Sequence, residues 1–224
     1  MIQRRHIVAF LLLFSSLTIP GVLQADRATD IVFSTGVLDS IPQGKHVTYR
    51  HQRLGPPDNN FHSVKDGLIT LGVFPDESGG EEAILEMRDG GKLQNRTPFP
   101  ADAGNPLVMA FLESSLRSMA QITGGSPFYL RNRIKEALRS GGSIEPVTVT
   151  VDGETLTAEK VVFIPFRNDK NAAKMGDFAG LELSFVVSDA VPGGFVQMSA
   201  QTPEAKGKRL YQEIMRYSAL SDQE

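Results

Sequence analysis

The chain has 224 residues, with 23 Lys and Arg against 26 Asp and Glu, and it contains neither cysteine nor tryptophan. A mildly acidic chain is a poor partner for nucleic acid, because binding to phosphates needs clustered Lys and Arg. The lack of cysteine excludes disulfides, thiolate nucleophiles, Cys-ligated zinc and lipid attachment at a cysteine that follows a signal peptide.

Residues 1–25 have the pattern of a cleavable secretory signal. Arg4 and Arg5 give a positive start, and an uncharged and mostly apolar run covers residues 7–22. Pro20-Gly21 breaks the run and Ala25 precedes the expected cleavage site, although Leu23 is larger than the small residue that usually stands three places before the cut. The run is shorter than the roughly 20 residues that a membrane-spanning helix needs. We therefore expect export to a Gram-negative periplasm, with residues 26–224 as a soluble mature protein rather than an integral membrane protein.

Four strand candidates follow the signal peptide. Their residues are rich in β-branched and aromatic types, and turn clusters of Gly, Pro, Asp and Asn separate them. The predicted ranges are 44–54, 61–74, 83–88 and 92–99.

The first strands contain all the histidines of the predicted mature protein, His46, His51 and His62. His46 and His51 are an odd number of residues apart, so a regular strand places them on opposite faces. His51 and His62, together with Asp58 or Asp66, make only an incomplete set of metal ligands. We expect no metal site and no other cofactor.

A pair of helices comes next. Asn105-Pro106 is a helix start, because a capping side chain precedes a proline at the first helical position, and apolar residues continue at helical spacing up to Gly124. Ser126-Pro127 repeats this signal, and the second helix ends at Gly141. The glycines before Ser126 also fit an anion-binding loop at a helix start. The alternative is structural: the two glycines end the first helix and Ser126 caps the second.

Strands resume after the helix pair, and Asp152-Gly153 is a two-residue hairpin signal between the first two. The predicted strand ranges are 147–151, 155–166, 181–187 and 195–200. In the last segment, residues 203–220, four apolar residues recur at helical spacing, which predicts an amphipathic helix. These residues are Leu210, Ile214, Met215 and Tyr217.

Strands and helices do not alternate along the chain, so parallel βαβ units are not expected. The predicted fold class is α+β, with residues 26–224 as a single domain. We expect a curved antiparallel β-sheet, a central helical hairpin packed on its concave face, and a C-terminal helix.

The order of these elements resembles the lipoprotein-carrier (LolA/LolB-like) superfamily and related uncharacterised periplasmic families. The local points of resemblance are the helix pair, residues 105–140, and the late hairpin, residues 186–200, with Val191-Pro192-Gly193-Gly194 at its turn. The likeness lies in the element order, and no sequence motif matches. It implies the fold and suggests an apolar cavity between sheet and helices.

Catalytic motifs are poorly represented in the sequence. It has no Gly-x-Ser-x-Gly elbow and no phosphate-binding loop. The carboxylate pairs Asp76-Glu77 and Glu81-Glu82 stand in a polar loop, where solvated charge is the default. We therefore expect a protein that is not an enzyme.

Tyr49, Arg50 and Arg53 form a small polar cluster in the first strand. Such arginines usually face solvent. An arginine that points under the sheet would instead order loops or bind an acyl carboxylate.

Two functions remain open. The first is a periplasmic binding or carrier protein for an apolar, acyl- or lipid-like ligand or a lipid-modified partner. The alternative is a structural or adaptor protein of the cell envelope, which binds another protein and has no ligand cavity. For the carrier, the apolar residues expected to line the cavity are Val108, Phe111, Leu112, Met119, Val149, Phe163, Phe185 and Phe195.

Overall fold

The computed structural model describes residues 27–57 and 61–222. The predicted signal peptide and its cleavage site lie outside the described residues, and so does Asp58 of the incomplete metal set. The signal peptide, its cleavage and a role for Asp58 stay predictions.

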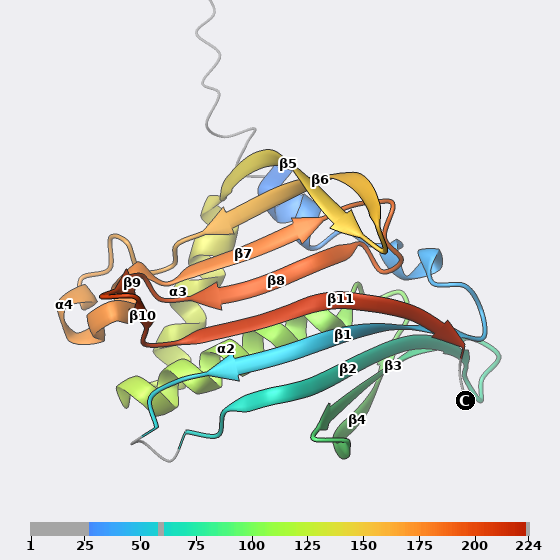
Figure 1. The fold of residues 1–224 in the computed structure, drawn as a ribbon, viewed down its shortest axis with the longest axis horizontal. Helices are drawn as coiled ribbons and strands as arrows, with labels where there is room; N and C mark the ends of the chain where they lie inside the picture. The colour runs from blue at the N-terminus through green and yellow to red at the C-terminus, as the bar shows by residue number, and fades with distance from the viewer. Residues whose placement is uncertain (1–26, 58–60, 223–224) are drawn as a thin grey trace, which may run out of the picture.

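A nine-stranded antiparallel sheet forms the frame of the fold (Figure 1). The strands lie in the order β4-β3-β2-β1-β11-β8-β7-β6-β5, and each pair of neighbours is antiparallel. Their bounds are Lys45–Leu54 (β1), Val64–Pro75 (β2), Glu81–Asp89 (β3), Lys92–Pro100 (β4), Ser143–Val151 (β5), Glu154–Phe163 (β6), Glu182–Val187 (β7), Phe195–Gln201 (β8) and Gln212–Asp222 (β11).

The sheet consists of two four-stranded meanders joined by the last long strand of the chain. β1 to β4 form one meander and β5 to β8 form the other. β11 lies between them and pairs with β1 on one side and β8 on the other, so that Met215 is opposite both His51 and Met198. The two halves of the sheet therefore depend on the C-terminal strand for their connection.

Helices α2 (Pro106–Thr123) and α3 (Pro127–Ser140) lie on one face of the sheet, behind the central strands in Figure 1. Both begin at the predicted proline. α2 ends at Gly124, whose φ of 67° is a left-handed conformation that glycine adopts without a steric penalty. The buried side chains of both helices belong to the same apolar cluster as the inward side chains of the sheet.

The start of α2 is fixed by Asn105. Its side chain accepts a hydrogen bond from the Leu107 amide at 2.9 Å and donates one to the Gly193 carbonyl, also at 2.9 Å. The Asn105 side chain therefore caps the helix and ties it to the turn that precedes β8.

We expect Asn105→Ala to lower the free energy of unfolding by about 1–2 kcal/mol, because both hydrogen bonds are lost at a buried site. Urea denaturation measures this loss. Ser126→Ala is the matched control, because Ser126 occupies the same position before α3 without a side-chain capping bond. Equal denaturation midpoints for the two variants would contradict the role of Asn105.

The predicted C-terminal helix is wrong. Residues 203–220 instead contain the short strands β9 (Glu204–Ala205) and β10 (Lys208–Arg209) and most of β11. Burial at the start of β11 has a period of two, since Tyr211 just before the strand and Glu213 and Met215 within it are fully buried while Arg216 is exposed. The apolar residues fit helical spacing equally well, and pairing with β1 and β8 decided in favour of a strand.

Smaller elements complete the described part of the chain. Residues 27–32 are helical, and η1 (Val37–Ser40), α4 (Ala172–Met175) and η2 (Gly176–Gly180) are short helical turns. Within the described ranges, no helix combines the length and apolar character that crossing a membrane requires.

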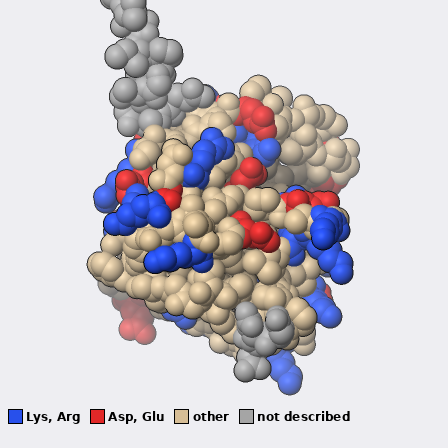
Figure 2. Space-filling model, turned by 90° about the vertical axis from the view of Figure 1, so that its left-hand side faces the viewer, with Lys and Arg blue, Asp and Glu red and all other residues tan. Residues whose placement is uncertain are grey.

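The end of the molecule that carries α4, β9 and β10 is shown in Figure 2. Lys and Arg side chains lie interspersed with Asp and Glu on this face.

Candidate functional site

Six of the eight predicted cavity residues lie in the packed layer between α2 and the sheet. Phe185 is at the centre of this layer, with its ring centroid 5.7 Å from Phe111, 6.1 Å from Phe163 and 6.4 Å from Phe195. These aromatic rings are at most 2% exposed, and so are Val108 and Met119. The six side chains belong to the protein core. That they contact a ligand stays a prediction.

Val149 lies on the other face of the sheet. It packs with a separate, smaller apolar cluster that includes Val186 and Val196, and it lines a pocket of about 450 Å³ there. The alternation of side chains along β5 causes this separation, since Val149 stands on the opposite face from Ile144, which joins the main core. The structure therefore does not bring Val149 together with the other predicted residues.

Leu112 lines an apolar groove between the helix pair and the N-terminal segment. We call this the helix groove, and its volume is about 370 Å³. Its apolar walls come from the N-terminal segment, from α2 and from α3, and consist of Phe33, Met109, Leu112, Leu116, Ile134 and Leu138.

The spacing of these residues explains the shape of the groove. Leu112 and Leu116 are one turn apart on α2, and Ile134 and Leu138 are one turn apart on α3, so each pair forms a continuous apolar stripe. The N-terminal segment closes the third side, and Thr29 fixes it by donating a hydrogen bond to the Leu138 carbonyl.

Large apolar side chains at the rim of the helix groove are exposed to solvent. Phe33 is 38% exposed and Met109 is 59% exposed. Exposed apolar side chains that gather around a concavity are typical of sites that bind a ligand or a partner. The helix groove therefore meets the geometric requirements of a site for an apolar ligand.

Charged side chains border the groove along α3. Arg131, Lys135 and Arg139 follow one another at a spacing of four residues, and Glu113 is the single acidic side chain in the lining. Glu113 accepts hydrogen bonds from Arg117 at 2.8 Å and from Arg131 at 3.0 Å. These two arginines, Arg117 foremost, hold the pKa of Glu113 below its ordinary value.

A second polar feature lies under the sheet, and its central residue, Glu213, was not among the predicted site residues. Glu213 of β11 is fully buried, and one of its oxygens is 2.8 Å from His51 Nε2. Ser114 and Ser115 of α2 donate to the carboxylate at 2.6 and 3.3 Å, and Tyr211 donates at 2.5 Å. Burial, together with the Glu213 charge, raises the pKa of Tyr211 well above its ordinary value.

Arg53 extends this cluster toward the end of β1. Its guanidinium donates to Ser114 at 2.9 Å and to the His62 carbonyl at 3.2 Å, and it lies over the Phe61 ring. Of the three polar residues noted in the first strand, Arg53 points under the sheet and orders a loop, whereas Arg50 is exposed. The Arg53 side chain thereby joins β1, α2 and the segment before β2.

Sequence reasoning missed Glu213 because it assigned the last segment to a helix. The signal that could have found it is the alternation of Tyr211, Glu213 and Met215, in which a glutamate takes the position of an apolar residue. Three hydroxyl groups donate to the buried carboxylate and His51 Nε2 lies within hydrogen-bond distance, so its hydrogen-bonding capacity is used within the protein.

The histidines do not converge on a common point. His51 Nε2 faces Glu213, whereas His62 is exposed and its Nε2 is 3.0 Å from Asp89 Oδ2. In the described part of the chain, His, Asp and Glu form no group of three or more that could hold a metal ion.

Asp76 of the β2–β3 loop forms hydrogen bonds within the loop. Asp76 accepts hydrogen bonds from the Ser78 hydroxyl, the Ser78 amide and the Gly80 amide. These bonds, the Ser78 hydroxyl first, lower the pKa of Asp76. These bonds close a turn, and Asp76 also lines a pocket of about 1060 Å³ together with Glu81 and Glu82.

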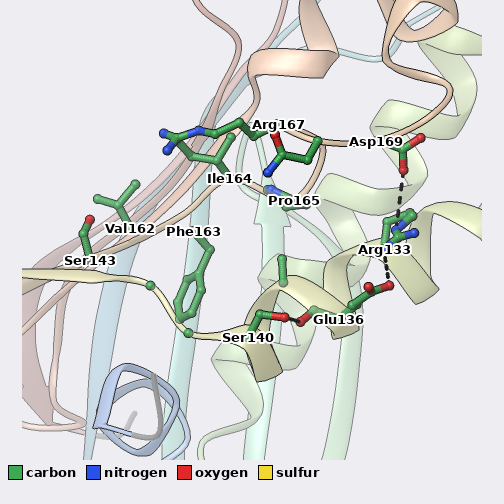
Figure 3. Close-up of a pocket in the computed structure, with 14 residues that line it drawn as sticks. Arg133, Glu136, Ser140, Ser143, Val162, Phe163, Ile164, Pro165, Arg167 and Asp169 are labelled. Carbon is green, nitrogen blue, oxygen red and sulfur yellow. Dashed lines mark hydrogen bonds and ion pairs between the residues drawn. The ribbon is translucent and has the colours of Figure 1, made fainter. Parts of the chain in front are cut away.

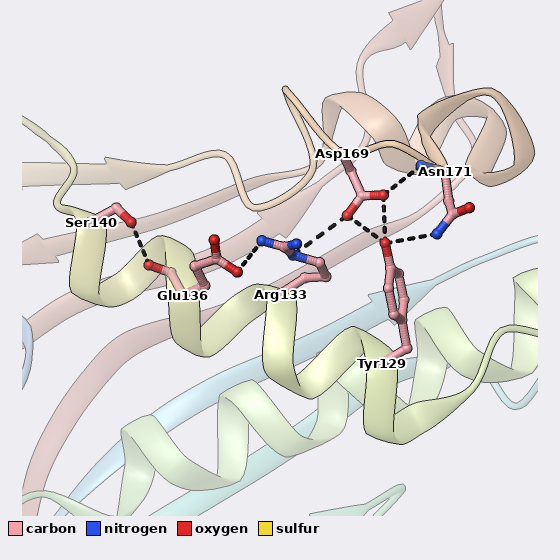
Figure 4. Close-up of polar contacts among 6 residues, drawn as sticks. All are labelled: Tyr129, Arg133, Glu136, Ser140, Asp169 and Asn171. Carbon is pink, nitrogen blue, oxygen red and sulfur yellow. Dashed lines mark hydrogen bonds and ion pairs between the residues drawn. The ribbon is translucent and has the colours of Figure 1, made fainter.

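A polar pocket of about 390 Å³ lies between the C-terminal half of α3 and the loop after β6 (Figure 3). The side chains along its edge are paired with one another (Figure 4). Asp169 accepts hydrogen bonds from Tyr129 at 2.6 and 2.7 Å, and Arg133 joins Asp169 to Glu136.

Asp169 is nearly buried, which by itself would raise its pKa, but hydrogen bonds from Tyr129 and the Asn171 amide hold the pKa below its ordinary value. Asn171 also donates to the Tyr129 hydroxyl at 2.9 Å. The ionised Asp169 therefore holds the loop after β6 against α3, and the role of this cluster is structural.

No protein-family model and no curated protein matches this chain. The solved structures that match include the Mycobacterium tuberculosis lipoprotein LppX, at 12% identity and a TM-score of 0.30, over 90% of this chain and 95% of that one.

Two further matches involve MucB. A chain of the Pseudomonas aeruginosa MucA/MucB complex has 13% identity and a TM-score of 0.36, over 87% of this chain and 56% of that one. A structure of MucB has 11% identity and a TM-score of 0.34, over 90% of this chain and 60% of that one. All three TM-scores are below 0.5, so none of these likenesses supports an inference about this chain.

Proposed function

We propose that this chain is a non-catalytic binding or carrier protein of the periplasm, related to the lipoprotein carriers, and that it holds an apolar acyl chain in the helix groove. Residues 26–224 form its single domain. The observation that carries the proposal is the helix groove itself, an apolar concavity of about 370 Å³ whose rim residues Phe33 and Met109 are exposed.

The chemistry of the groove supports an acyl chain. Its three walls present aliphatic and aromatic side chains from separate elements, and its volume is within the range of roughly 300–1,000 Å³ that is usual for ligand pockets. Each methylene group that leaves water contributes about 0.8 kcal/mol to binding. Leu112 is the predicted site residue that lies in this groove, and a ligand role for the other seven stays a prediction.

Dodecanol, an uncharged single-chain ligand, tests the proposal. The probe N-phenyl-1-naphthylamine becomes fluorescent in apolar sites, and we expect dodecanol to displace it from the purified mature protein at micromolar concentration. Met109→Asp should weaken dodecanol binding at least about tenfold, which corresponds to roughly 1.4 kcal/mol, because it places a charge at the groove rim.

Phe128→Asp is the matched control. Phe128 is also exposed on the helix pair, at 71%, but it is not part of the groove lining. Dodecanol affinity equal to that of the wild type is expected for this variant. Lack of dodecanol binding by the wild type, or a Met109→Asp variant that binds like the wild type, would refute the proposal. The first result favours the adaptor function, in which a protein partner binds this surface.

A further inference from the structure

The charged side chains along the helix groove differ in whether they form ion pairs. Arg131 forms an ion pair with Glu113, whose other oxygen is held by Arg117. Lys135 and Arg139 also line the groove, and neither forms an ion pair with any residue in the described ranges. The half of the groove beside the C-terminal turns of α3 therefore carries two exposed positive charges that have no ion-pair partner among the described residues.

These two cations stand next to the apolar walls. Lys135 follows Ile134 and Arg139 follows Leu138, so each charge is one residue away from a side chain that forms the groove wall. The long aliphatic stems of Lys and Arg can lie along apolar surface while their charged ends stay in water. An amphiphile with its chain in the groove would thus find positive charge where the chain emerges.

We infer that the helix groove selects a single-chain carboxylate, a long-chain fatty acid, whose carboxylate binds Lys135 and Arg139. This inference rests on the proposed function and adds the chemistry of the head group to it. Charge complementarity carries it, because three basic side chains and one acidic side chain line the groove and the acidic one is already paired. The volume of about 370 Å³, near the lower end of the usual range, favours one chain over the two of a diacyl lipid.

Dodecanoate and dodecanol, compared by displacement of N-phenyl-1-naphthylamine, test the inference, because they have the same chain and differ in the head group. We expect dodecanoate to bind about fivefold more tightly at low ionic strength, which is the size of effect that two exposed ion pairs give. Sodium chloride at about 0.5 M should reduce the difference, since salt screens exposed charges.

The double variant Lys135→Gln/Arg139→Gln should bind both ligands with the dodecanol affinity of the wild type. Lys170→Gln/Lys174→Gln removes the same net charge from exposed positions outside the groove and is the matched control. It should keep the preference for dodecanoate. Unchanged binding of dodecanol by the groove variant shows that the variant is folded.

The outcomes separate the two proposals. If neither ligand binds to the wild type, the proposed function fails and the selectivity fails with it. If both ligands bind equally to the wild type, or if the groove variant keeps the preference for dodecanoate, the inference is wrong while the acyl-binding function stands. A preference lost equally in the control variant would also overturn it, because the effect would then come from the net charge.

Discussion

Replacing Glu213 by alanine is expected to lower the free energy of unfolding by about 3 kcal/mol, because a buried polar group that loses its hydrogen-bond partner costs about 1–3 kcal/mol and several such groups surround Glu213. The carboxylate accepts hydrogen bonds from Ser114, Ser115 and Tyr211 and lies 2.8 Å from His51 Nε2. Without it, these polar groups stay buried and lose their common partner. Urea denaturation of the purified variant, followed by circular dichroism, measures the loss.

Glu182→Ala is the control for this variant. Glu182 is an exposed residue at the start of β7, in the same sheet, so its removal should change the free energy of unfolding by no more than about 0.5 kcal/mol. Glu213→Gln should fall between the two alanine variants, because the amide keeps an acceptor but not the charge. A Glu213→Ala variant with the midpoint of the wild type would show that the carboxylate does not join α2 to the sheet.

Phe111→Ala is expected to cost about 3–5 kcal/mol of stability, because it removes a fully buried ring and leaves a cavity. Phe111 is the contact through which α2 reaches Phe185 at the centre of the core. The lost ring therefore weakens the attachment of the helix pair to the sheet as well as the core itself.

Thermal and urea denaturation of Phe111→Ala and Phe128→Ala provide the comparison. Phe128 is the same residue type on α3 but is 71% exposed, so its truncation should leave the denaturation midpoint nearly unchanged. Similar losses in both variants would mean that burial of the Phe111 ring does not govern its contribution.

The sequence by itself predicted the parts of the fold that depend on local signals. Asn105-Pro106 and Ser126-Pro127 mark the starts of α2 and α3, because capping and the fixed φ of proline act within one turn. Asp152-Gly153 joins β5 to β6, where both residues adopt the positive φ that a tight hairpin needs. Short-range chemistry alone decides such features.

The candidate site depended on information that the sequence does not hold locally. An alternating strand does not say which face meets the helices, and so Val149 was grouped with residues that lie on the other side of the sheet. The helix groove exists because an N-terminal segment packs beside α2 and α3, which begin only at Pro106 and Pro127, a juxtaposition made by the fold.

In the last segment, the tertiary structure and not the local sequence determines the secondary structure. Apolar residues between Leu210 and Tyr217 satisfy helical and extended periodicity alike, so local preference leaves the choice open. β1 and β8 each present an edge with backbone N–H and C=O groups to the space between them. A strand in that space pairs its own backbone groups with those of both neighbours. Only that long-range pairing makes residues 212–222 a strand and buries Glu213 against α2.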